Sequence, residues 1–80
     1  MFLYYFLLIN QQIKARVELE NQIIIYKNDL NFRGIKKEKL NQKLTEISNW
    51  IKNNRNTALI EDYKNKIEEI QKFVTDLRIY

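Results

Sequence analysis

The chain has 80 residues and a net charge of +4, with 45% apolar and 30% charged residues, which are the proportions of one small globular domain. It contains no Cys, no His, no Pro and one Gly, which excludes disulfides and thiolate metal sites, removes the usual general base and argues against a turn-rich all-β fold. We therefore expect an all-α binding or structural module that is not an enzyme and has no cofactor or metal of its own.

The N-terminal segment, residues 1–10, begins with the apolar, uncharged run MFLYYFLLI. This run is too short to cross a bilayer, which takes about 20 residues. It also has no basic residue before it and no small-residue cleavage site after it, as a signal peptide would. Three interpretations stay open: a helical extension that packs on the bundle, a weak membrane-surface anchor, or the start of a truncated reading frame with no selected role.

The first helix is expected over residues 10–31, because apolar residues recur there at spacings of three and four. The stripe consists of Leu19, Ile23, Tyr26 and Leu30, which we expect in the core, and Ile9, Ile13 and Val17 continue it toward the N-terminus. Asn28, Asn31 and Gly34 then interrupt the helical pattern.

The second and third helices are expected over residues 36–53 and 57–79, separated by the Asn-rich stretch 53–57. The apolar residues expected in the core are Leu40, Leu44, Ile47, Trp50 and Ile51 in the second helix, and Ile60, Tyr63, Ile67, Ile70, Val74 and Leu77 in the third. Asn56 or Thr57 is the expected N-cap of the third helix. Short loops place neighbouring helices antiparallel, so the sequence predicts an antiparallel three-helix bundle.

The positive charge is concentrated in residues 33–43, which carry five basic groups and one acidic group. Such a cluster suits either a phosphate or anionic-lipid site, or a solvated loop with its first helical turns. We favour the second interpretation, because nucleic-acid-binding domains usually show a broader basic stripe. We therefore expect no nucleic-acid partner and do not expect a membrane partner.

Four stretches in the chain resemble, in order and spacing, the helical lid of the 70-kDa heat-shock (DnaK-like) chaperones. ARVELEN at 15–21 resembles the family's ARNALES stretch, and QIIIYKNDL at 22–30 takes the place of the aromatic-rich segment that follows it. KLTEISNWI at 43–51 resembles KCxEVISWL, and TA at 57–58 with EDY at 61–63 and IEEI at 67–70 resembles TAEKEEFEHKxKELEKV. The resemblance covers about residues 11–80.

The resemblance implies the lid subdomain that closes over unfolded peptide held by the chaperone's β-sandwich, in a cytoplasmic protein of the stress response. It predicts a fragment or truncated homologue whose partners are chaperone core domains, unfolded clients or co-chaperones. The family uses ATP and magnesium, but this chain contains neither its ATPase domain nor its β-sandwich, and it departs from the family in its apolar start and in lacking the acidic EEVD tail. Two alternatives stay open, namely a stand-alone helical or coiled-coil interaction module and a small membrane-surface protein that uses residues 1–9.

Overall fold

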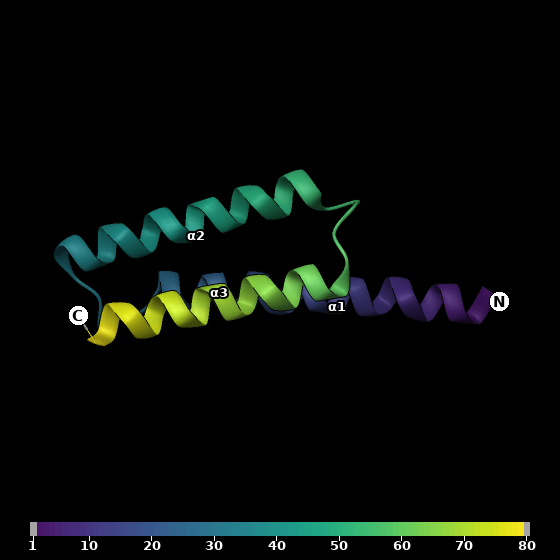
Figure 1. The fold of residues 1–80 in the computed structure, drawn as a ribbon, viewed down its shortest axis with the longest axis horizontal. Helices are drawn as coiled ribbons and strands as arrows, with labels where there is room; N and C mark the ends of the chain where they lie inside the picture. Colours follow the sequence, from purple (N-terminus) through teal and green to yellow (C-terminus); the bar gives the residue numbers. More distant parts are fainter. Residues whose placement is uncertain (1, 80) are drawn as a thin grey trace.

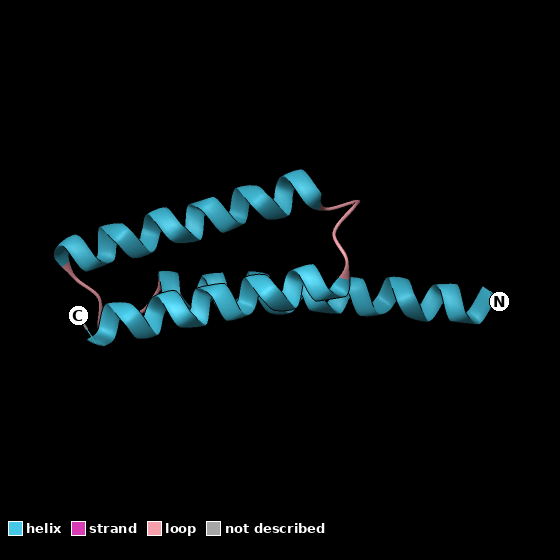
Figure 2. Ribbon diagram, viewed as in Figure 1, coloured by secondary structure: helices cyan, strands magenta, loops and turns pink. Residues whose placement is uncertain are grey.

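The computed structural model describes the backbone of residues 2–79 and the side chains of residues 7–79. It contains three helices, α1 (Phe2–Lys27), α2 (Gly34–Asn54) and α3 (Ile60–Ile79), and Figure 2 shows no strand among the described residues. In Figure 1, α1 and α3 run in the same direction, and α2 lies beside them and runs in the opposite direction. The predicted antiparallel three-helix bundle is therefore confirmed.

The molecule is elongated because α1 extends beyond the other two helices. Its dimensions are 51 × 20 × 17 Å and its radius of gyration is 14.5 Å, whereas a compact domain of this length has a radius of gyration of about 12 Å. Figure 1 shows the N-terminal turns of α1 projecting past the start of α3. We call residues 2–10 the α1 extension. The three interpretations of the N-terminal segment depend in part on the side chains of residues 1–6, which lie outside the described residues.

The core lies where the three helices face one another. Most of the residues expected there are buried, namely Leu19, Leu40, Leu44, Ile47, Ile51, Tyr63, Ile70 and Val74. Others pack on this cluster while half-buried, namely Ile23, Tyr26, Trp50, Ile60, Ile67 and Leu77. Four further residues that the sequence analysis did not select also belong to it: Ala15, Phe32 and Ala58 are buried and Phe73 is partly buried.

The expectation that Leu30 lies in the core is wrong, since its side chain is 83% exposed. The first helix ends at Lys27 rather than at residue 31, because the Asp29 carboxylate accepts a hydrogen bond from the Asn31 N–H at 2.9 Å and forms an Asx turn there. The turn changes the direction of the chain, so that Leu30 faces solvent and Phe32 enters the core with 5% exposure. The same helix begins at Phe2 rather than at residue 10.

The second helix begins at Gly34, two residues before its predicted start, and ends one residue after its predicted end. Gly34 has a φ of +62°, a left-handed conformation that glycine adopts without the steric cost that a Cβ brings. It therefore allows the chain to turn from the extended backbone of Arg33, with φ −140°, directly into α2.

The third helix begins at Ile60 rather than at residue 57, and its N-cap is neither Asn56 nor Thr57. The N–H groups of Thr57 and Ala58 both donate to the Asn54 carbonyl, at 3.1 and 2.7 Å, and so close the C-terminus of α2. Asp62 accepts a hydrogen bond from the Leu59 N–H at 2.9 Å, which is one half of a capping box. The helix therefore starts only after the chain has finished capping α2.

Candidate protein-binding surface

Among the described residues, seven of the eleven exposed large apolar side chains lie on α1. Ala15 and Leu19 on this helix are buried, whereas Ile13, Val17 and Ile24 are 43%, 43% and 56% exposed. Positions 13, 17 and 24 are four and seven residues apart, so they lie on one side of the helix, away from the side that carries Ala15. We call Ile13, Val17 and Ile24 the outer face of α1. The helix therefore has apolar residues on two sides, an inner one that the bundle covers and an outer one that the exposed Glu20 interrupts between Val17 and Ile24.

The apolar surface continues into the α1 extension. Leu7, Leu8 and Ile9 are 57%, 37% and 37% exposed, and Asn10 is the only polar residue among residues 7–10. Within the described part of the chain, no helix is sufficiently long and apolar to span a membrane. An apolar helix end that leaves the bundle in this way presents surface that a second molecule can cover.

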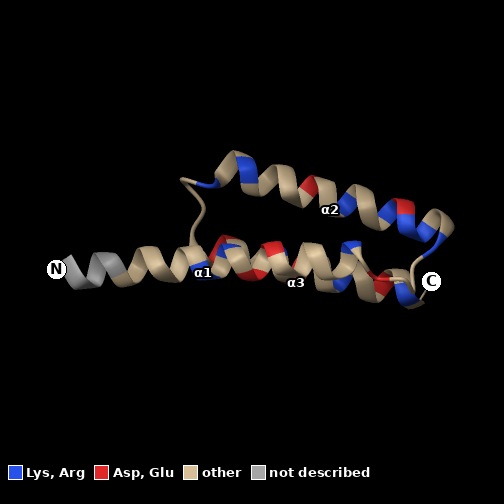
Figure 3. Ribbon diagram, turned by 180° about the vertical axis from the view of Figure 1, so that it is seen from behind, with Lys and Arg blue, Asp and Glu red and all other residues tan. Residues whose placement is uncertain are grey.

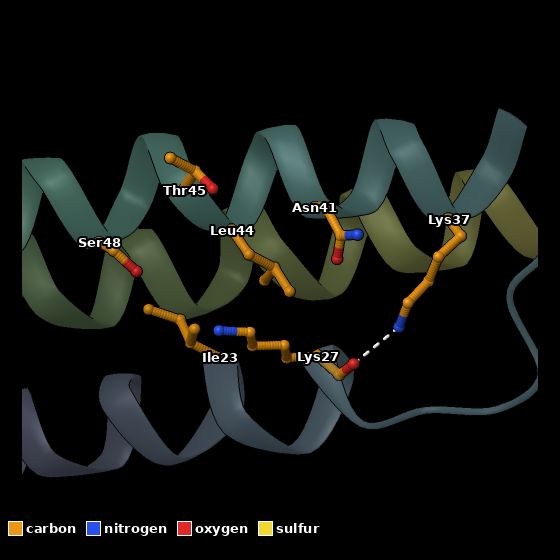
Figure 4. A pocket seen from close by; sticks show the side chains of 7 residues that line it. All are labelled: Ile23, Lys27, Lys37, Asn41, Leu44, Thr45 and Ser48. Carbon is orange, nitrogen blue, oxygen red and sulfur yellow. Dashed lines mark hydrogen bonds between the residues drawn. The ribbon is translucent and has the colours of Figure 1, made fainter.

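A shallow groove follows the seam between α1 and α2. Its wider part has a volume of about 240 Å³. Figure 4 shows Ile23 and Lys27 of α1 facing residues of α2 across it, and the lining residues are Ile23, Lys27, Lys37, Asn41, Leu44, Thr45 and Ser48. A second hollow of about 220 Å³ shares Ile23 and Ser48 and extends the groove to Glu20, Ile24 and Ile51. The groove thus has an apolar floor with hydroxyl and amide groups along its α2 side, and it opens beside the outer face.

The predicted basic cluster of residues 33–43 is partly used inside the molecule. Lys37 donates from Nζ to the Lys27 carbonyl at 2.7 Å, a bond drawn in Figure 4, and so caps the C-terminal end of α1. Lys43 forms ion pairs with Glu69 at 2.9 Å and Glu46 at 3.6 Å. Of the remaining basic residues, Lys36 and Lys39 are exposed near the start of α2, and Figure 3 shows acidic positions among the basic ones along this helix. This distribution favours the solvated-helix interpretation of the cluster.

Two ion pairs join separate parts of the bundle, one midway along α2 and α3 and one between the α1–α2 loop and the end of α3. The Glu69 carboxylate of α3 forms ion pairs with Lys43 of α2 and, at 3.2 Å, with Lys66 of its own helix. The hydrogen bond from Lys43 holds the pKa of Glu69 below its ordinary value. The same hydrogen bond raises the pKa of Lys43. Near the C-terminal end of α3, Arg78 pairs with Asp29 of the α1–α2 loop at 3.3 Å. The hydrogen bond from the Asn31 backbone N–H, and to a smaller extent Arg78, lowers the pKa of Asp29.

Trp50 has a packing role in this arrangement. Its ring meets Tyr63 edge to face, with centroids 5.6 Å apart and planes at 84°, and the Lys66 ammonium lies over the Trp50 ring, 5.1 Å from its centroid. Both contacts are favourable geometries for an indole. Trp50 therefore joins α2 to α3 and is half-buried.

No metal or cofactor site emerges from these side chains. Among the residues whose side chains are described, no three Asp, Glu, His or Cys residues gather in a way that would hold a metal ion. Comparison of the chain with protein-family models, with curated proteins and with solved structures gives no match.

Proposed function

We propose that this chain is a non-catalytic, lid-like protein-binding module of the 70-kDa heat-shock type, which covers an apolar protein surface with α1. The observation that carries the proposal is the outer face of α1, whose three residues stay 43–56% exposed beside α2 and α3. A cover needs a stable body and an element that reaches past it. The bundle supplies the body, and α1, which projects beyond α3 in Figure 1, supplies the reach.

The resemblance of residues 11–80 to the chaperone lid supports the same proposal independently of the surface. The ARVELEN stretch, which resembles the family's ARNALES, spans residues 15–21 of α1, between exposed Ile13 and Ile24. The stretch that resembles KCxEVISWL contributes Trp50 and Ile51, which pack α2 onto the bundle. The similar residues thus contribute both to the body and to the helix that we propose as the covering element.

The test adds the chain to a lid-deleted 70-kDa chaperone that holds a fluorescent peptide in ADP. We expect peptide release to slow severalfold. Val17→Glu should abolish the effect, because it places a charge in the middle of the outer face. Ile35→Glu is the matched control, since Ile35 is also exposed, at 70%, but lies in the first turn of α2. An unchanged release rate with the wild-type chain would contradict the lid proposal.

A second candidate function is a stand-alone helical interaction module that pairs through α1. The spacing of Ile13, Val17 and Ile24 favours it, because steps of four and seven residues recur in coiled-coil seams. Sedimentation equilibrium separates the two functions. A stable dimer that Val17→Glu converts to a monomer would favour the interaction module, whereas a monomeric wild-type chain would favour the lid.

A further inference from the structure

A small pocket lies where the α2–α3 loop meets α1. Its volume is about 200 Å³. Two arginines line it, Arg16 from α1 and Arg55 from the loop, together with the side-chain amides of Gln12 and Asn56. No Asp or Glu belongs to the described lining. Each of these four side chains offers N–H donors, so the pocket combines several hydrogen-bond donors with two guanidinium charges, of which that of Arg16 is paired with Glu20.

Arg16 is held in the pocket with part of its guanidinium unsatisfied. Its side chain is 18% exposed and its Nε lies 3.4 Å from a Glu20 carboxylate oxygen. Among the described atoms, however, Nε is buried without a hydrogen-bond partner. A buried donor that lacks a partner costs free energy in the folded protein. Because Nε itself is enclosed, a ligand in the pocket would reach only the exposed part of the Arg16 side chain, which is 18% of its surface.

Arg55 brings a second guanidinium whose charge is not neutralised within the described part of the chain, where no carboxylate lies within ion-pair distance of it. It directly follows the last residue of α2. Guanidinium groups bind planar oxyanions through paired N–H donors. Arg16 and Arg55 carry like charges and line the same pocket. An anionic group bound there would therefore reduce the repulsion between them.

We propose that this pocket binds the carboxylate of an acidic side chain, or of a chain terminus, in a protein segment with neighbouring apolar residues. Ile9 and Ile13 also line the pocket, and Ile13 belongs to the outer face of α1. A ligand seated there therefore meets an anion site and an apolar wall together, which fits a peptide better than a nucleic acid. The lining of the pocket supports the oxyanion site by itself. That the oxyanion belongs to a protein segment depends on the proposed function.

The experiment measures fluorescence anisotropy of a labelled peptide, Ac-Gly-Leu-Leu-Glu-Leu-Gly-amide, and of its Glu→Gln counterpart with the full chain. We expect the Glu peptide to bind about tenfold more tightly, as charge-assisted hydrogen bonds allow, and to weaken as salt is added. Arg55→Gln should remove the difference. Arg33→Gln should preserve it, because Arg33 flanks the opposite end of α2 and does not line the pocket.

Arg16→Met gives a second, independent variant. It retains an apolar stem while removing the unsatisfied Nε, so it should melt no lower than wild type yet lose the preference for the Glu peptide. Equal binding of the two peptides to the wild-type chain would overturn the proposal. Displacement of the Glu peptide by millimolar inorganic phosphate would support an oxyanion site, whereas Arg55-dependent binding of a 12-nucleotide single-stranded DNA more tightly than the peptide would overturn its assignment to a protein. A lid assay that fails while the Glu preference persists would reject the proposed function and leave the oxyanion site standing.

Discussion

The inner and outer sides of α1 carry similar apolar residues, yet the bundle treats them differently. Leu19 on the inner side is fully buried, whereas Val17, two positions before it, is 43% exposed. Ala15 explains part of the choice, because a small side chain lets a neighbouring helix approach closely. The comparison teaches that an apolar stripe on a helix identifies surface that can be covered, and that the partner helices decide which stripe becomes core.

The largest expected effect comes from truncating the inner side. Leu19→Ala should lower the free energy of unfolding by about 2–5 kcal/mol, because it leaves a cavity in a fully packed site. Val17→Ala, on the outer side of the same helix, should cost less than about 1 kcal/mol. Urea titrations followed by circular dichroism measure both values. Equal costs for the two variants would show that both sides of α1 are covered.

A smaller effect on stability is expected at Trp50, whose side chain is only partly buried. Trp50→Ala should cost about 2–3 kcal/mol, below the 3–5 kcal/mol of full burial, because the ring is half-buried between Tyr63 and Lys66. Trp50→Phe is the control, since it retains an aromatic face for the edge-to-face contact. Thermal melts should give a lower melting temperature for Trp50→Ala than for Trp50→Phe. A wild-type melting temperature for Trp50→Ala would contradict the packing role.

The Lys43–Glu69 ion pair should make the free energy of unfolding depend modestly on pH. Because the folded pKa of Glu69 lies below its ordinary value, its contribution to stability is present at neutral pH and is lost as the pH falls below about 4.5. Because the pKa of Lys43 is raised, its contribution is present below its ordinary pKa and is lost only in strong alkali. The Glu69 side chain is 38% exposed, so the expected change is less than about 1 kcal/mol.

Urea titrations at pH 7 and pH 3 measure this contribution. The wild-type chain should lose more stability on acidification than Glu69→Gln does, while Glu61→Gln, an exposed residue in the first turn of α3, should behave like the wild type. An identical loss in wild type and Glu69→Gln would show that the pair does not stabilise the fold.

The smallest effect on stability is expected from the α1 extension. Deleting residues 1–9 should leave helicity and cooperative melting nearly unchanged, within about 1 kcal/mol, because Leu7, Leu8 and Ile9 are exposed. The deletion should also raise solubility, since it removes an uncovered apolar surface. Circular dichroism and light scattering measure the two outcomes. Loss of the cooperative transition would show instead that this segment belongs to the core.

The candidate site was less predictable from the sequence than the fold. Apolar spacing in the first helix includes Ile13, Val17 and Leu19 in one drifting stripe, and only the positions of α2 and α3 separate its exposed members from its buried ones. The Arg16–Arg55 pocket joins residues 39 positions apart. No local pattern marks such a pair, because the loop after α2 must fold back against α1 before the two side chains share a pocket.

The sequence by itself determined that the chain forms three helices, because 3.6-residue periodicity and the turn-forming Asn and Gly residues are local properties. Only the tertiary structure decided where these helices end and which sides they bury. Because of the Asx turn at Asp29, Phe32 rather than Leu30 lies in the core. Because the Thr57 and Ala58 N–H groups cap the Asn54 carbonyl, α3 begins later than the sequence predicts. The physical reason is that helix ends are settled by hydrogen bonds to the few backbone groups left unpaired there, and burial by whichever helix packs alongside.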